Sequence, residues 1–93
     1  MTLIPIGAYD DAWPDIHLRP EEAVIVHLAL KGKVLFPIHW GTFDLAAHTW
    51  SEPIERLVKT TEAEDIDLIA PRLGEIVDSD NRIDLIRWWE NLE

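Results

Sequence analysis

One predicted helix between two short apolar runs limits the folds open to this chain. Residues 2–8 and 33–38 are apolar enough for buried strands. Gly7, near the end of the first run, fits a strand whose end approaches other backbone closely. Between them Pro20 favours the first turn of a helix, and Gly32 favours its end. Two strands joined through a helix run parallel in one sheet by a right-handed crossover. The sequence therefore predicts a βαβ unit.

The rest of the chain continues this alternation. Ser51-Glu52-Pro53 is typical of a helix start, residues 66–70 predict a third strand, and residues 82–92 predict a last helix. The order strand–helix–strand–helix–strand–helix indicates an α/β fold. Parallel strands normally need both faces covered, and these helices would cover about one. We therefore expect half of a larger sandwich.

Composition narrows the function classes. The 93 residues allow one small domain, and a formal net charge of −10 disfavours nucleic acid and anionic lipid as partners. The absence of cysteine excludes disulfides, thiolate zinc sites and cysteine nucleophiles. No apolar run is long enough to span a bilayer, and we expect a cytoplasmic protein.

His39 is the first candidate for chemistry. It follows the apolar run that ends at Ile38 and precedes a turn at Gly41. A histidine at the end of a parallel strand points its imidazole out of the sheet edge, where α/β proteins keep their ligands. From residue type alone, a histidine that only makes hydrogen bonds at a strand end is the commoner case.

Four segments change that balance, because they occur together in one order: Ile4–Tyr9, Trp13–His17, Pro20–Ala23 and His39–Phe43. In this order and spacing they resemble the C-terminal part of metallo-β-lactamase-fold hydrolases, on the branch that includes N-acyl-phosphatidylethanolamine phospholipase D. The resemblance implies that residues 1–93 are a single partial domain, the C-terminal half of an αββα sandwich.

The resemblance also implies two site residues. The family histidine that matches His39 is the last ligand of a two-zinc centre. The histidine that matches His17 lies near those metals, where it orients substrate or polarises a phosphoryl oxygen as a catalytic residue. The alternative for His17 is a loop histidine that only makes hydrogen bonds around the site, and both readings stay open.

Most of the family's metal ligands are missing from this chain. The family supplies them from a His-x-His-x-Asp-His loop, a further histidine and a bridging aspartate, whereas the four histidines here are widely separated. Zinc sites in proteins use three or four ligands, so one imidazole cannot hold the metal. We expect no bound cofactor in this chain alone and a structural role for His27. His48 lies in residues 48–53, which also resemble the family, and we expect it to pack against the loop after His39 and hydrogen-bond to it.

The prediction that follows is a fragment of a zinc-dependent, phospholipase D-like hydrolase that is inactive by itself. One alternative is an enzyme completed by a separate upstream chain that supplies the N-terminal half. Another is a non-catalytic self-association module, with a homodimer covering the open sheet face. Trp50, Trp88 and Trp89 are the candidate interface residues.

Overall fold

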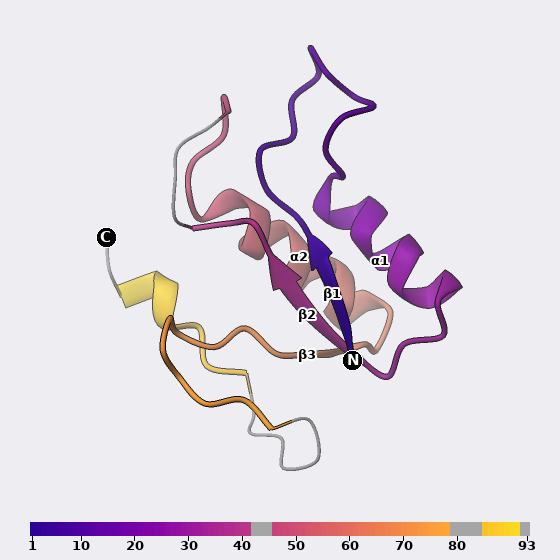
Figure 1. Cartoon of the computed structure of the whole chain (residues 1–93). Coiled ribbons are helices and arrows are strands. Elements are labelled where there is room, and N and C mark those ends of the chain that lie inside the picture. Colours follow the sequence, from indigo (N-terminus) through magenta and orange to yellow (C-terminus); the bar gives the residue numbers. More distant parts are fainter. Residues whose placement is uncertain (42–45, 79–84, 92–93) are drawn as a thin grey trace.

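The computed structural model of the chain describes residues 1–41, 46–78 and 85–91 (Figure 1). It is a small α/β fold, as the sequence predicts. The elements follow in the order β1 (Thr2–Pro5), α1 (Pro20–Ala29), β2 (Val34–Ile38), α2 (Glu52–Ala63), β3 (Asp67–Leu68) and the short 3₁₀ helix η1 (Trp88–Asn91).

The sheet has three parallel strands in the order β1-β2-β3, so the predicted parallel βαβ unit is confirmed. Leu3 pairs with Phe36 in the β1–β2 register. Beyond the end of β1, the Ile6 N–H donates to the Ile38 carbonyl oxygen at 3.0 Å, which keeps the two strand ends together. The third strand lies where it was predicted but is shorter, with only Asp67 and Leu68 in strand conformation.

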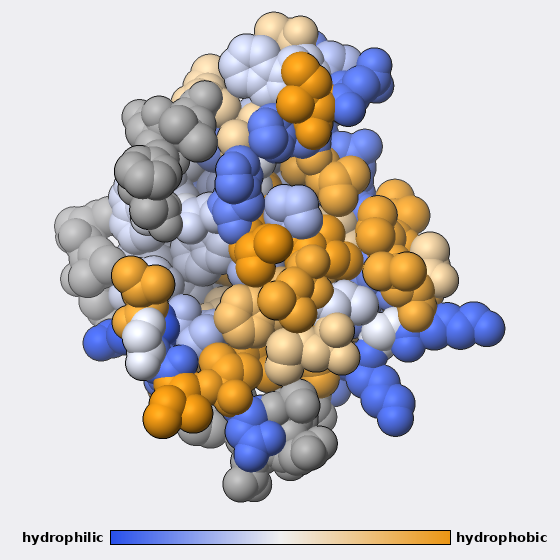
Figure 2. All heavy atoms as spheres, in the orientation of Figure 1, coloured by the Kyte–Doolittle hydropathy of each residue, from blue (hydrophilic) through white to orange (hydrophobic). Residues whose placement is uncertain are grey.

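Both helices lie on one side of the sheet and pack against each other (Figure 1). Their shared core includes side chains with no exposed surface: Ile6, Leu35, Ile54 and Leu57. The other face of the sheet is more open. Leu3 of β1 is 58% exposed and Ile38 of β2 is 37% exposed, and Figure 2 shows apolar atoms gathered over these strands. An open apolar sheet face is what a sheet with helices on one side leaves.

α1 ends before Gly32, the position at which its sequence predicts the end. Lys31, not the glycine, takes the left-handed conformation, with φ of 56°. The Lys31 N–H donates to the Leu28 carbonyl at 3.0 Å, and the Gly32 N–H donates to the His27 carbonyl at 3.1 Å. This pair of bonds is the Schellman motif.

The structure corrects the helix predicted for residues 82–92. Residues 82–84 and 92 lie outside the described part of the chain, residues 85–87 are not helical, and only Trp88–Asn91 form a 3₁₀ turn. The Trp88 indole N–H donates to the Ala70 carbonyl at 2.9 Å, and the Trp89 indole N–H donates to Glu55 Oε1 at 2.7 Å. Anchoring two adjacent indoles to separate segments overrides the local apolar pattern.

Trp89 also departs from its expected place at an interface. Its side chain is 1% exposed and belongs to the core of this chain. Trp88 and Trp50 are only partly buried.

Candidate functional site

The carboxyl ends of β1 and β2 touch through their backbones. A Cβ built on Gly7 would lie 2.1 Å from the carbonyl oxygen of His39, a contact that no side chain can make. The sequence predicted a close backbone approach at Gly7, and the structure confirms it. His39 itself has φ of 62°, in the left-handed region that non-glycine residues rarely adopt.

His17 and His39 come together at this edge of the sheet. Their rings are stacked, with centroids 5.2 Å apart and planes 13° from parallel. His17 reaches the edge from the loop between β1 and α1, and its side chain is half-buried while His39 is exposed. The two residues that the resemblance singles out are therefore neighbours, although their roles remain predictions.

The described part of the chain does not hold a metal site of its own. Among residues 1–41, 46–78 and 85–91 there is no group of three or more histidine, cysteine, aspartate or glutamate side chains that could bind one ion. Thr42 and Phe43, the last two residues of the motif at His39, lie outside the described residues. Two imidazoles fall short of the three or four ligands that zinc takes from proteins.

Ala8, directly after Gly7, is held by two side chains. Its φ is 61°, its N–H donates to His48 Nε2 at 3.0 Å, and its carbonyl accepts from the Trp13 indole N–H at 2.9 Å. Because Nε2 of His48 accepts, the ring proton is on Nδ1, which lies 2.9 Å from the Thr49 carbonyl and donates to it. Both ring nitrogens of His48 are thus used within the chain.

The Tyr9 ring packs against the His48 ring. The two rings stack with centroids 4.4 Å apart, and Tyr9 is 6% exposed. The Tyr9 hydroxyl donates to Glu52 Oε2, and the Arg56 guanidinium lies 4.7 Å from the Tyr9 ring centroid. Burial, followed by the hydrogen bond to Glu52, raises the pKa of Tyr9 well above its usual value, so the phenol stays protonated.

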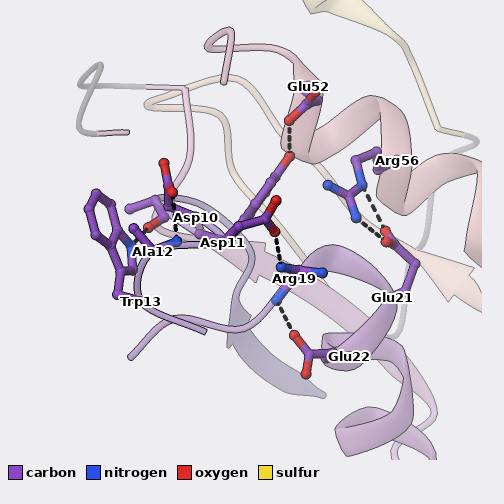
Figure 3. Close-up of polar contacts among 11 residues, drawn as sticks. Asp10, Asp11, Ala12, Trp13, Arg19, Glu21, Glu22, Glu52 and Arg56 are labelled. Carbon is purple, nitrogen blue, oxygen red and sulfur yellow. Dashed lines mark hydrogen bonds and ion pairs between the residues drawn. The ribbon is translucent and has the colours of Figure 1, made fainter. Parts of the chain in front are cut away.

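Arg56 also joins the two helices. Its guanidinium donates two hydrogen bonds to the carboxylate of Glu21, which lies in the first turn of α1 (Figure 3). The hydrogen bond to Glu21 raises the pKa of Arg56 further above its usual value. The N-terminal ends of α1 and α2 are therefore tied together beside the loop that carries His17.

The acidic residues of that loop have structural partners. Asp10 Oδ1 accepts from the Ala12 N–H at 2.9 Å, and Asp11 pairs with Arg19 (Figure 3). These contacts fit loop carboxylates rather than a catalytic pair.

His27 is a core residue far from this edge. It is 1% exposed, and its Nδ1 lies 2.6 Å from the Thr2 hydroxyl. Desolvation lowers the pKa of His27, which favours the neutral ring. The structural role predicted for it is confirmed.

Sequence reasoning found only one of the two bonds of His48. It was expected to bond the loop after His39, and its Nδ1 does so at the Thr49 carbonyl, but its Nε2 also bonds Ala8 in the loop after β1. The two residues are 40 positions apart in the chain, and no local pattern joins them. The only signal was the family-like stretch in which His48 lies.

Comparison with known proteins identifies several relatives of this chain. No protein-family model matches it. An uncharacterized protein of Mycobacterium tuberculosis is 49% identical over 92 residues, and the match covers 96% of this chain and 25% of that protein. An N-acyl-phosphatidylethanolamine-hydrolyzing phospholipase D 1 of Caenorhabditis elegans is 32% identical over 89 residues, and that match covers 88% of this chain and 25% of that protein.

A mitochondrial N-acyl-phosphatidylethanolamine-hydrolyzing phospholipase D of Saccharomyces cerevisiae is 31% identical over 64 residues, 67% of this chain and 14% of that protein. The chain is thus a distant homologue of these phospholipases. It spans about a quarter of the length of the mycobacterial and nematode relatives. No described helix is long and apolar enough to cross a membrane.

Proposed function

We propose that this chain is one segment of a metal-dependent hydrolase of the metallo-β-lactamase fold, on the N-acyl-phosphatidylethanolamine phospholipase D branch. The stacking of His17 on His39 at the carboxyl edge of β1 and β2 carries the proposal. The 32% and 31% identities to two phospholipases of that name support it. A parallel sheet with helices on one side fits the C-terminal part of an αββα sandwich.

Within such an enzyme His39 would be a metal ligand, and His17 would face the substrate. In the intact family the two metal ions supply an activated water for attack on a phosphodiester or related ester. The described residues of this chain do not fit a metal by themselves. The proposal therefore requires ligands from other residues, and the chain alone is inactive.

A chimera tests this proposal. The 89-residue segment of the nematode phospholipase D that matches this chain is replaced by the chain, and hydrolysis of N-acyl-phosphatidylethanolamine and metal content are measured. We expect activity in the chimera, loss of activity and metal in His39→Ala, and lower turnover with metal retained in His17→Ala. His27→Asn, in the core, serves as the matched control and should leave both readouts unchanged.

Two results would count against the proposal. One is a folded chimera that binds no metal, and the other is full activity in the His39→Ala chimera. The alternative of an enzyme completed by a separate chain is tested by adding this chain to the truncated phospholipase as a second polypeptide. Activity that returns only on mixing favours assembly from two chains.

A second candidate, self-association, is favoured by the open face of the sheet. Leu3 and Ile38 expose 58% and 37% of their surfaces there. A symmetric dimer would bury these apolar groups, and Trp50 and Trp88 are the remaining interface candidates. The net charge of −10 opposes pairing, but salt screens exposed charges at physiological ionic strength.

A further inference from the structure

We propose that His48 and Trp13 are positioning residues for the His17–His39 pair, and that they act through the backbone of Ala8 and Gly7. The importance of the pair rests on the proposed function, but its geometry can be tested in this chain alone.

The backbone conformation of the described residues first points to Ala8. Four non-glycine residues have positive φ: Ala8, Lys31, His39 and Asp65. Lys31 and Asp65 each follow the last turn of a helix, where the left-handed conformation is common. Ala8 and His39 have no such reason. Ala8 follows Gly7, and the His39 carbonyl lies against Gly7 where the ends of β1 and β2 come together. Strained residues of this kind persist only where their surroundings hold them.

Two side chains bind the two backbone groups of Ala8. His48 accepts from its N–H at 3.0 Å, and Trp13 donates to its carbonyl at 2.9 Å. His48 is itself fixed by its bond to the Thr49 carbonyl at 2.9 Å and by its stack on the buried Tyr9 ring. The strained conformation of Ala8 is therefore set from two sides.

Ala8 is bonded to Gly7, and Gly7 in turn contacts the backbone of His39. The Gly7 Cα lies so close to the His39 carbonyl that a Cβ there would be 2.1 Å from the oxygen. A backbone contact this close prevents the two strand ends from moving toward each other, and the hydrogen bond from the Ile6 N–H to the Ile38 carbonyl opposes their separation. The orientation of His39, and so its stack on His17 at 5.2 Å, depends on where Ala8 is held.

Nuclear magnetic resonance of the chain tests the proposal, with cross-peaks between the ring protons of His17 and His39 as the readout. His48→Phe keeps an aromatic ring for the stack on Tyr9 but removes the acceptor, and we expect the cross-peaks to disappear. His48→Gln places an amide oxygen near the position of Nε2, and we expect them to return. Trp13→Phe removes the second bond to Ala8 and should also weaken them.

Ile54→Val is the matched control, because it loosens the core at a fully buried residue of α2 that makes no bond to Ala8. It should leave the His17–His39 cross-peaks unchanged. If this variant weakens them as much as His48→Phe does, the effect is general loosening and the proposal is wrong. Unchanged cross-peaks in folded His48→Phe, or no recovery in folded His48→Gln, would also overturn it.

The unmodified chain offers a check that does not depend on a variant folding. A scalar coupling across the hydrogen bond between the Ala8 amide nitrogen and His48 Nε2 is expected, and its absence would contradict the proposal. These readouts involve neither metal nor hydrolysis. An inactive chimera with the coupling and cross-peaks intact would therefore reject the proposed function alone.

Discussion

Of the four glycines, Gly7 has the least room for a side chain, because the His39 carbonyl occupies the space where its Cβ would lie. Gly7→Ala would place a Cβ 2.1 Å from that oxygen, and the strand ends would have to separate. We expect a loss of roughly 3 kcal/mol in the free energy of unfolding, measured by urea denaturation.

Gly74→Ala is the control for the glycine change. Gly74 has φ of 88° but no atom within 4 Å of a built Cβ. Its substitution meets backbone strain without a clash, and part of that strain is offset by a less flexible unfolded chain, so the net cost should be about 1 kcal/mol or less. An equal loss in the two variants would contradict the close contact at Gly7.

His27 makes stability depend on pH in a stated direction. Burial lowers the pKa of His27 in the folded chain, while the unfolded chain takes up the proton near the usual value of about 6.5. The unfolded state therefore binds more protons as the pH falls below about 6.5, and the stability present above that pH is lost. His27→Asn, which can still bond the Thr2 hydroxyl, should lose less stability between pH 7.5 and about 5.5.

The pH experiment compares urea unfolding of the two proteins at each pH. Only the difference between them reports on His27, because the rest of the chain is the same in both. Parallel stability curves over this range would show that His27 is not held neutral by burial.

At this scale the sequence predicted what depends on neighbours in the chain. His39 at a strand end and the close approach at Gly7 follow from local patterns, and both were found. The stack of His17 on His39 needed the fold to bring a loop and a strand end together. The bond from Ala8 to His48 joins residues 40 positions apart, and nothing in the local sequence distinguishes His48 from a loop histidine.

Among the helices and strands, the end of α1 can be tested directly, because a lysine occupies a position there that favours glycine. Lys31 has φ of 56°, and glycine adopts this conformation without the clash of a Cβ. Lys31→Gly should raise the free energy of unfolding by about 0.5–1 kcal/mol. The measurement is thermal or urea unfolding.

Lys33→Gly is the matched control for this helix end. Lys33 is also exposed, but it is not one of the described residues with positive φ. Glycine there only adds freedom to the unfolded chain, so a small loss of stability is expected. If both substitutions destabilise the chain equally, Lys31 does not carry the strain assigned to it.

The elements also show which sequence patterns were decisive. α1 and α2 were predicted from a proline in the first turn, and β2 from a continuous apolar run. Each of these signals lies within one element. The last helix was not, since Trp88 and Trp89 are anchored to Ala70 and Glu55 from other parts of the fold. A pattern of apolar spacing carries no information about such distant acceptors.

For the whole molecule, the open sheet face predicts self-association. Sedimentation at micromolar concentrations should show a monomer–dimer equilibrium, because pairing would bury apolar groups such as Leu3. Leu3→Lys should shift the chain to monomer. Ile76→Lys changes an apolar residue that is 93% exposed elsewhere and should sediment like the unmodified chain.

A compact monomer at every concentration would contradict this second candidate. Equal effects of Leu3→Lys and Ile76→Lys would also contradict it, since the association would then not involve the sheet face. Neither outcome bears on His39, because that residue lies at the carboxyl edge of the sheet.

We propose that His39 belongs to a metal site whose other ligands lie outside this chain. Elemental analysis of the purified monomer fraction, for zinc, manganese and iron, tests it most directly, with His39→Ala as the comparison. We expect only a small fraction of one ion per chain in both proteins, because the described residues contain no group of three ligands. About one tightly held ion per monomer, lost in His39→Ala, would show that this chain completes a metal site by itself and would contradict the claim.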